Sequence, residues 1–210
     1  RQNFSQVTNP PIDSLRENKV MSLKTRFGNL GNILDFDNLT EENIYVLESP
    51  ILTNSQFKKF KNLFKKKIRI LDCIFDVNSS LKERIEKIKE EAETSVREGS
   101  NNLILSDKKI SSSHMSIPSV LAVGAVHSHL VKLGLRGYCS INVESSDVLD
   151  THSFAVLIGV GATTINPYLA IDSIYQRFEK KLFSKTDFES CVAKFKKSID
   201  DGLLKIMSKM

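Results

Sequence analysis

The stretch Ile68-Arg-Ile-Leu-Asp-Cys-Ile-Phe75, followed by a second apolar run at Leu103-Ile-Leu105, decides the fold. Each run is short and apolar, which favours a buried strand. The apolar side chains between the two runs recur at helical spacing: Leu81, Ile85, Ile88, Ala92 and Val96. A strand, a helix and a strand within about 40 residues form a βαβ unit, whose strands pair in parallel with a right-handed crossover.

Polar residues mark both ends of this helix. Ser80 stands three residues before Glu83, the spacing of a capping box in which each side chain bonds the other residue's backbone N–H. Gly99 stands where a left-handed residue closes a helix. The sequence therefore predicts a helix from about residue 81 to residue 98.

The strand and helix pattern then repeats. We expect Ser116 to cap a helix with Pro118 in its first turn and with its end at Gly134, because proline needs no hydrogen-bond acceptor there. The apolar runs at residues 139–143 and 154–158 predict two further strands.

The ends of the chain continue the alternation. Asn166-Pro167 begins another helix, and Thr186 with Glu189 forms a second capping box that opens the last one. Nearer the start, residues 44–47 predict a strand and residues 54–64 a helix.

Five strands interleaved with helices predict an α/β fold with a mostly parallel sheet, like an incomplete (β/α) barrel. An open doubly wound sheet is the alternative. Residues 41–200 form this domain. In residues 1–40, Asn9-Pro10-Pro11 and the glycines Gly28 and Gly31 interrupt any period, so we expect an extended or looped segment that packs on a neighbouring domain. A path across the edge of the sheet is the alternative.

Composition narrows the class of protein. The 210 residues are 40% hydrophobic and 26% charged, with a net charge of +5, which is typical of a soluble globular protein. No run approaches the roughly 20 apolar residues of a membrane span, so we exclude a membrane protein. The chain lacks an initiating Met and ends inside a helical pattern, which suggests a piece of a longer polypeptide.

Cysteine usage indicates a reducing, cytoplasmic location. The three cysteines, Cys73, Cys139 and Cys191, lie far apart and form no C-x-x-C pair. A disulfide framework and an iron–sulfur cluster held by this chain alone are therefore not expected.

A lysine-rich stretch raises the question of nucleic-acid binding. Six lysines fall within residues 58–67, interleaved with Phe57, Phe60 and Phe64. Lysines beside aromatic rings can bind single strands by charge neutralisation and stacking. The three phenylalanines share one helical face, however, which favours a buried face with the lysines on the solvated side.

Other patterns predict little chemistry. His127 and His129 are two residues apart on a helix and point away from each other, so a shared metal ion is not expected. Gly159-Val-Gly161 would follow a strand, but Thr164 replaces the third glycine of a dinucleotide-binding loop, so we interpret these glycines as a tight turn.

Three aspartates lie at or near strand ends, where α/β active sites gather: Asp72, Asp76 and Asp107. Asp76 and Asp107 would face one another across neighbouring strands. No base or metal ligand accompanies them in a known pattern, so the residues alone predict no catalytic residue and no metal site.

Long motifs throughout the chain resemble the central domain of the large subunit of glutamate synthases. They include Phe4-Ser-Gln-Val-Thr-Asn-Pro-Pro-Ile-Asp-Ser-Leu-Arg16, Ser49-Pro-Ile-Leu52, Leu103-Ile-Leu-Ser-Asp107, Ala125-Val-His-Ser-His-Leu130, His152-Ser-Phe-Ala-Val-Leu-Ile-Gly-Val-Gly-Ala162 and Asn166-Pro-Tyr-Leu-Ala170. Val160 departs from the family, which has Tyr there, and the match over residues 26–34 is loose.

This resemblance implies a barrel-like domain that connects an amidotransferase domain to an FMN-binding domain and helps to form an ammonia tunnel. The parent enzyme makes two glutamates from glutamine and 2-oxoglutarate by reductive amide transfer, with FMN and an iron–sulfur cluster. The fragment itself is expected to hold no cofactor, to be inactive alone and to bind neither nucleic acid nor membrane. The alternative is an independent α/β module that binds anionic ligands or nucleic acid.

The same resemblance implies positions for two sites. We expect the start of the chain to line the tunnel or the amidotransferase interface, through Gln6, Thr8, Asn9, Pro10, Pro11 and Asp13. Residues 201–210 would begin the FMN-binding domain, with Met207, Ser208 and Lys209 at the cofactor. The electron donor of the intact enzyme, ferredoxin or a small NADPH-dependent subunit, is left open.

Overall fold

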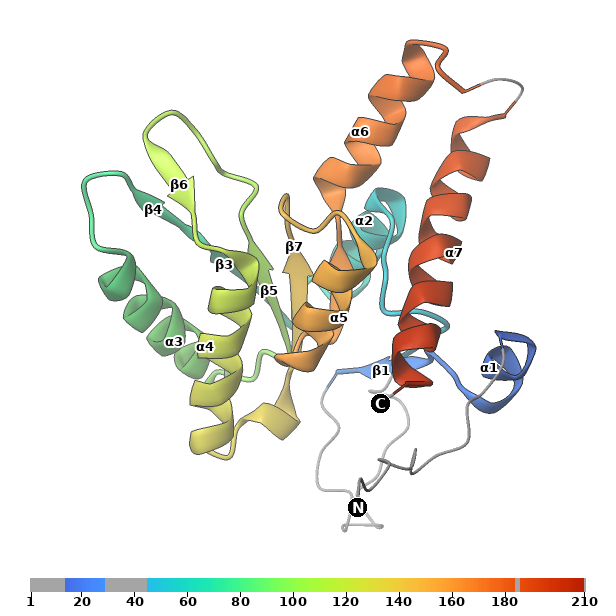
Figure 1. Cartoon of the computed structure of the whole chain (residues 1–210). Coiled ribbons are helices and arrows are strands. Elements are labelled where there is room, and N and C mark those ends of the chain that lie inside the picture. The colour runs from blue at the N-terminus through green and yellow to red at the C-terminus, as the bar shows by residue number, and fades with distance from the viewer. Residues whose placement is uncertain (1–13, 29–44, 184–185, 210) are drawn as a thin grey trace, which may run out of the picture.

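The computed structural model describes residues 14–28, 45–183 and 186–209 (Figure 1). Its elements, in chain order, are α1 (Ser14–Val20), β1 (Thr25–Phe27), β2 (Tyr45–Leu47), α2 (Asn54–Leu63), β3 (Ile68–Asp72), β4 (Ile74–Asp76), α3 (Leu81–Arg97), β5 (Asn102–Ser106), β6 (His114–Ser116), α4 (Ser119–Lys132), the 3₁₀ helix η3 (Arg136–Tyr138), β7 (Ser140–Glu144), α5 (Thr151–Gly159), β8 (Thr164–Asn166), α6 (Tyr168–Glu179) and α7 (Phe188–Met207).

A four-stranded parallel sheet with the order β3-β5-β7-β8 forms the centre of the domain. Helices α3, α4 and α5 each lie in the connection between successive strands, so neighbours along the chain are neighbours in the sheet. At the β8 edge, Ile51 forms a parallel bridge with Ile165. The α/β class and the parallel sheet are therefore confirmed. The four strands follow chain order, as in part of a (β/α) barrel, and the sheet they form is open.

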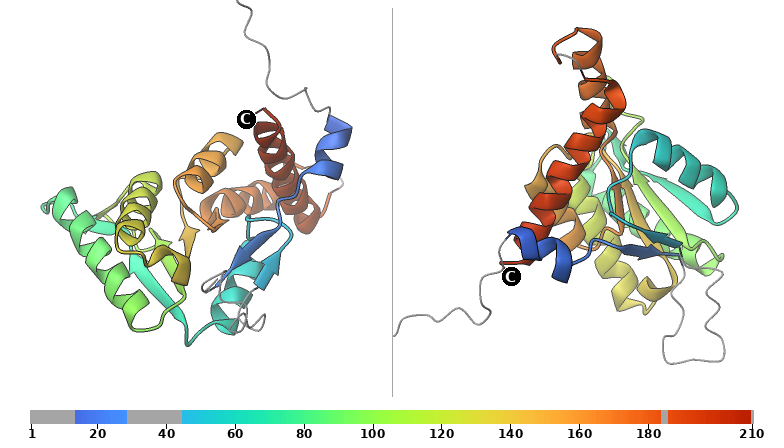
Figure 2. Two further views of the ribbon diagram at one scale, coloured as in Figure 1. Left: turned by 90° about the horizontal axis from the view of Figure 1, so that it is seen from below. Right: turned by 90° about the vertical axis from the view of Figure 1, so that its right-hand side faces the viewer.

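Apolar side chains cover both faces of this sheet. Leu105, Val143 and Ile165 point into the larger core, which α3, α4, α5 and α7 share. Helix α2 lies on the opposite side of the sheet, as the right-hand view of Figure 2 shows. It packs there in a second cluster whose buried members are Phe27, Leu52, Phe57, Phe60 and Ile104.

The predicted strand at residues 154–158 is wrong, because these residues lie in helix α5. Five consecutive apolar residues fit a buried strand and a buried helix equally well. The local signal for the helix stands just before the run, where the Asp150 carboxylate accepts a hydrogen bond from the Ser153 N–H at 2.9 Å. The fourth strand of the sheet is the short β8 instead.

The predicted strand at residues 68–75 divides at Cys73. Its first part, β3, pairs with β5 in the main sheet, whereas β4 pairs antiparallel with β6 in a separate two-stranded arm. The Cys73 N–H still bonds the Ser106 carbonyl, and the Ile117 N–H bonds the Cys73 carbonyl. Cys73 is therefore the point at which the chain leaves the sheet.

The three predicted helix caps differ in detail from the structure. Ser80 is the N-cap of α3, but its side chain makes no capping hydrogen bond. Ser116 ends β6, and the Asp147 carboxylate accepts from the Ser119 N–H at the start of α4 instead. At α7 the cap is Asp187. The predicted helix ends agree better with the structure. Gly99 follows α3 and Gly134 follows α4, and both glycines have a positive φ angle.

The predicted domain limits stay predictions. Helix α1 lies in the segment expected to be extended or looped, and it packs against α7. Helix α7 runs without interruption across the predicted boundary between residues 200 and 201, where we placed the start of the FMN-binding domain. Among the helices described, none combines the length and the apolar composition needed to span a bilayer.

Candidate functional site at the carboxyl ends of the parallel strands

The face of the sheet beneath α2 carries a row of buried polar side chains. The strand register places Ile104 beside Asn142 and Asn142 beside Thr164, so all three face α2. Thr164 Oγ1 donates to Asn142 Oδ1 at 2.6 Å, and Asn142 Nδ2 donates to the Leu103 carbonyl at 3.3 Å. Because an unpaired buried polar group costs about 1–3 kcal/mol, this row fixes the register of three strands.

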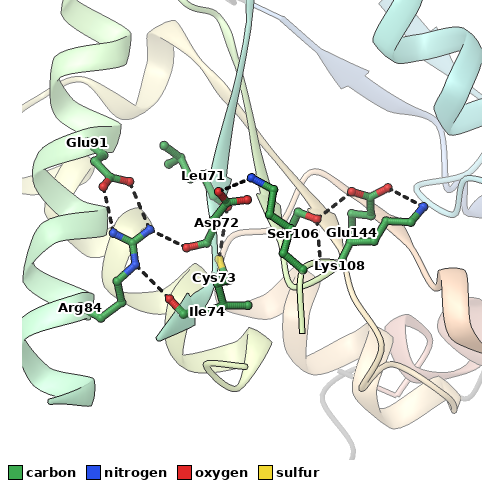
Figure 3. Close-up of polar contacts among 10 residues, drawn as sticks. Leu71, Asp72, Cys73, Ile74, Arg84, Glu91, Ser106, Lys108 and Glu144 are labelled. Atoms are coloured by element: carbon green, nitrogen blue, oxygen red, sulfur yellow. Dashed lines mark hydrogen bonds and ion pairs between the residues drawn. The ribbon is translucent and has the colours of Figure 1, made fainter. Parts of the chain in front are cut away.

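Glu144, at the carboxyl end of β7, is the centre of a charged cluster (Figure 3). Its side chain is only 4% exposed. Oε2 accepts a hydrogen bond from Ser106 Oγ at 2.7 Å, while Oε1 lies 3.0 Å from Lys61 Nζ and 3.5 Å from Lys108 Nζ. With both oxygens occupied and two cations beside it, this carboxylate is a paired structural charge and not a free general base.

Asp107 directly follows β5 and is also buried, at 4% exposure. Its Oδ2 accepts hydrogen bonds from the Ser146 N–H at 2.8 Å, the Ser146 hydroxyl at 2.7 Å and the Ser145 hydroxyl at 3.2 Å. Burial, reinforced by the charge of Asp107, raises the pKa of Tyr168 to about 12. The Tyr168 hydroxyl is therefore protonated at neutral pH and does not serve as a base.

The other two aspartates at strand ends have partners of their own. Asp72 Oδ2 accepts from Lys109 Nζ at 2.7 Å, and Asp76 Oδ1 accepts from the Asn78 N–H at 2.8 Å. The structure thus gives Asp76 and Asp107 separate partners instead of the facing pair that the sequence suggested.

Arg84 holds the break between β3 and β4, as Figure 3 shows. Its guanidinium donates to the Asp72 carbonyl at 2.6 Å, to the Ile74 carbonyl at 3.1 Å and to Glu91 at 2.9 Å. Burial raises the pKa of the enclosed Cys73 thiol to about 12. Cys73 is therefore a protonated core residue and not a nucleophile.

The two histidines of α4 have different surroundings. His127 Nδ1 accepts from Arg136 Nε at 3.1 Å, and burial beside Arg136 lowers the pKa of His127. His129 Nε2 lies 3.0 Å from Glu93 on α3. In the part of the chain that the structure describes, no group of three or more His, Cys, Asp or Glu residues is placed to hold a metal ion.

The lysine stretch forms the solvated side of α2, as its spacing predicts. Phe57 and Phe60 are buried against the sheet, and Lys58 and Lys59 are exposed. Lys61 differs, because it reaches back to Glu144. The Gly159-Val-Gly161 turn also differs from prediction, since it ends helix α5 and not a strand.

The sequence reasoning missed most members of the carboxyl-end cluster. Glu144 and Ser145 come directly after the predicted strand at residues 139–143, so the rule that strand ends carry sites would have selected them. Lys61 and Tyr168 gave no such signal, because each reaches the cluster from a different helix. None of these contacts forms a nucleophile–base pair.

Two surface grooves flank helix α7. One, of about 610 Å³, lies between α2, α6 and α7 and is lined by residues that include Asn54, Tyr175 and Val192. The other, of about 480 Å³, is lined by residues of β1, α5 and α7, among them Met207. The domain therefore offers concave surfaces on both sides of its last helix.

Comparison with known proteins identifies the family of this chain. The sequence pattern of the family described as "Glutamate synthase central domain" matches residues 1–210, the whole chain. The chain belongs to this family. In this member of the family, the described residues form the open parallel sheet reported above.

The relatives are much longer proteins. The chain is 51% identical over 213 residues to a glutamate synthase [NADPH] large chain of Azospirillum brasilense, 40% identical over 225 residues to a chloroplastic ferredoxin-dependent glutamate synthase of Spinacia oleracea and 39% identical over 214 residues to a glutamate synthase [NADPH] large chain of Bacillus subtilis. Each alignment covers 100% of this chain and 14% of the relative.

The residues assigned through the family resemblance divide into two groups. Gln6, Thr8, Asn9, Pro10, Pro11 and Asp13 lie outside the described residues. Met207, Ser208 and Lys209 lie at the end of α7, where Ser208 Oγ donates to Glu17 Oε1 at 3.0 Å and to the Lys205 carbonyl at 2.7 Å. Both assignments stay predictions.

Proposed function

We propose that this glutamate synthase central domain connects an amidotransferase domain to an FMN-binding domain and forms part of the passage for ammonia between them. The parent polypeptide would make two glutamates from glutamine and 2-oxoglutarate by reductive amide transfer. The domain would be inactive alone and cytoplasmic in location. The observation that carries the proposal is the match of the whole chain to the family and to 14% of each glutamate synthase.

The described structure supports a connecting role. Glu144 and Asp72 are paired with lysines, and Cys73 is protonated in the core, so each has a structural role. The grooves beside α7 are lined mainly by apolar atoms, as expected where other domains pack. A dry passage between packed domains would keep ammonia unprotonated and retain it for reaction with 2-oxoglutarate.

The cofactors of such an enzyme, FMN and an iron–sulfur cluster, would be bound in the neighbouring domains. Met207, Ser208 and Lys209 do not fit a complete flavin site. The Glu17 carboxylate is 3.0 Å from the Ser208 hydroxyl and would repel a flavin phosphate there, although Lys209 is exposed. We therefore propose that these three residues border the cofactor site of the next domain.

We propose that the segment containing Thr8, Asn9, Pro10 and Pro11 lines the tunnel or the interface with the amidotransferase domain. In a full-length enzyme, Asn9→Ala should weaken the coupling between glutamine hydrolysis and glutamate formation and release ammonia. Unchanged coupling and retention would show that this segment only anchors the domain edge. Ferredoxin or a small NADPH-dependent subunit would deliver electrons elsewhere on the polypeptide.

A chimera tests the proposed function directly. The aligned segment of the Azospirillum brasilense large chain would be replaced by this chain, which is 51% identical to it. We expect glutamine-dependent glutamate formation within about tenfold of the parent, because a compatible connecting domain preserves the geometry of both active sites. A soluble, flavin-loaded chimera that hydrolyses glutamine but makes no glutamate would contradict the proposal. Salt-sensitive binding of single-stranded nucleic acid by the chain alone would favour the independent binding module instead.

A further inference from the structure

The two edges of the central sheet differ in how they are covered. The sheet ends at β8 on one side and at β3 on the other. The chain covers the β8 edge itself, because the Ile165 N–H donates to the Pro50 carbonyl at 2.8 Å and the Leu52 N–H donates to the Ile165 carbonyl at 2.9 Å. On the outer side of β3, no segment among the described residues forms a β-pair. The sheet is therefore open at β3.

The strand register shows which backbone groups of β3 point outward. In a parallel pair, alternate residues bond the neighbouring strand, and the residues between them point the other way. The Cys73 N–H donates to the Ser106 carbonyl at 2.7 Å, which places the odd-numbered residues of this stretch on the β5 side. The N–H and C=O groups of Ile68 and Ile70 therefore face away from the sheet. Within the described structure, no hydrogen bond reaches these four groups.

Arg84 closes the same edge at its carboxyl end (Figure 3). Asp72 and Ile74 are even-numbered, and the Arg84 guanidinium meets their carbonyls from the outer side, at 2.6 Å and 3.1 Å. A charged side chain placed on an edge is a common protection against strand pairing. Here it protects only the end of the edge, so residues 68–70 stay accessible to a further strand.

The side chains along the open edge alternate in character. Ile70 is 49% exposed, and its register partner Ile104 places it on the face of the sheet that carries α2. Arg69 is exposed and points to the opposite face. Across a strand pair, opposite charges attract and like charges repel. A strand that places a carboxylate beside Arg69 and an apolar side chain beside Ile70 therefore fits this edge.

The same pattern disfavours a second copy of the chain as the partner. Symmetric antiparallel pairing centred on residue 69 would place Arg69 opposite Arg69, and pairing centred on residue 68 would place Arg69 opposite Lys67. Pairing centred on residue 70 would bring Ile68 of one copy to the Asp72 carbonyl of the other, which Arg84 already caps. The edge is suited to a strand of a different sequence.

From these observations we infer that β3 pairs with a strand from another domain of the parent polypeptide, and that this strand carries a carboxylate beside Arg69. The inference rests on the proposed function as a connecting domain. The chain covers only 14% of the relatives, so most of such a polypeptide lies outside it. A strand in the same polypeptide meets β3 at a high effective concentration. Main-chain hydrogen bonds give affinity in this mode of binding, and alternate side chains give specificity.

Amide hydrogen exchange, resolved to single residues by mass spectrometry, tests the inference. In the 210-residue chain alone, the Ile70 N–H should exchange rapidly, whereas the Leu71 N–H faces β5 and should be protected. In the full-length parent polypeptide, exchange at Ile70 should slow by about a hundredfold or more, because the added strand must first separate. Leu71 is the internal control and should stay protected in both proteins.

Variants of the parent polypeptide assign the protection to strand pairing. Arg69→Glu should speed exchange at Ile70 about tenfold, because an attractive cross-strand pair becomes a repulsive one. Lys87→Glu is the matched control, since it reverses another exposed charge, on α3, and it should leave exchange at Ile70 unchanged. Ile70→Pro removes the outward N–H at a position where an edge strand tolerates proline, and it should return Ile68 to rapid exchange.

Three results would overturn the inference. The first is an Ile70 N–H that exchanges as fast in the parent polypeptide as in the chain alone. The second is equal exchange in Arg69→Glu and Lys87→Glu. The third is protection of Ile70 in the chain alone that grows with its concentration, which would show pairing with a second copy.

The proposed function fails on a different measurement, the retention of ammonia. A parent enzyme that retains ammonia while Ile70 stays unprotected would refute the added strand and leave the passage intact. An enzyme that protects Ile70 but releases ammonia would refute the passage and leave the added strand intact.

Discussion

Gly161 lies directly against the imidazole ring of His127. A Cβ atom at position 161 would stand 2.5 Å from His127 Cγ and closer still to Nδ1, and the φ angle of Gly161 is 117°. The same glycine presents its carbonyl to Arg136 Nη2 at 2.9 Å, while Arg136 Nε bonds His127. The turn between α5 and β8 is thus locked to the end of α4, and glycine is required there for both space and conformation.

Replacement of Gly161 should therefore destabilise the domain. We expect Gly161→Ala to lower the free energy of unfolding by about 3 kcal/mol or more, from backbone strain and the clash with the ring together. Gly159→Ala is the matched control, because a Cβ there meets nothing within 4 Å; it should change stability by less than about 0.5 kcal/mol. Urea denaturation of both variants decides the question, and equal losses would refute this account of the turn.

A second close approach joins α5 to α7. A Cβ on Gly202 would lie 2.6 Å from Thr151 Cγ2. Gly202→Ala should cost about 1–3 kcal/mol, and Thr151→Ala in the same chain should recover part of the loss. Gly124→Ala in α4, where a Cβ has open space, should instead stabilise by about 0.5–1 kcal/mol through helix propensity. Thermal unfolding of these three variants measures the differences, and a missing rescue would argue against the contact.

Arg84 should be far more important for stability than Arg97 on the same helix. Arg84→Ala leaves the carbonyls of Asp72 and Ile74 without their guanidinium donor, so we expect a loss of about 2–3 kcal/mol. Hydrogen exchange should also become faster in β4 and β6. Arg97 forms an exposed pair with Glu93, and Arg97→Ala should stay within about 0.5 kcal/mol. Similar losses for both arginines would disprove a special role for Arg84.

His127 should make stability depend on pH near neutrality. Burial and Arg136 lower its pKa in the folded domain, so below about pH 6.5 the unfolded chain binds more protons than the folded chain does. Its contribution is present above about pH 6.5 and is lost as the pH falls through the folded pKa. The free energy of unfolding of His127→Gln should therefore fall less between about pH 7.5 and pH 5.5. His152→Gln, at an exposed position, is the control and should keep the full dependence.

Patterns repeated over many residues predicted the fold well. The helical spacing from Leu81 to Val96 and the apolar runs of β3, β5 and β7 depend on burial over a whole element, so they predicted α3 and the parallel sheet correctly. Residues 154–158 failed because an unbroken apolar run has no period. The cap of α7 moved by one residue, from Thr186 to Asp187, because neighbouring polar residues compete for the same position.

The candidate site was much harder to predict from the sequence. Asp72 and Asp107 were selected by their place at strand ends, and both do lie in polar clusters there. Lys61 meets Glu144 across 83 positions of the chain, and no local pattern records such a contact.

The most direct measurement of the central claim follows nitrogen through the full-length chimera. The enzyme would turn over unlabelled glutamine and 2-oxoglutarate in a buffer that contains isotopically labelled ammonium. If this domain helps to enclose the passage between the two active sites, the new glutamate should carry almost no label, because ammonia from glutamine does not mix with the buffer. Label in the new glutamate in proportion to the buffer ammonium, from an enzyme that still couples glutamine use to glutamate formation, would contradict the account.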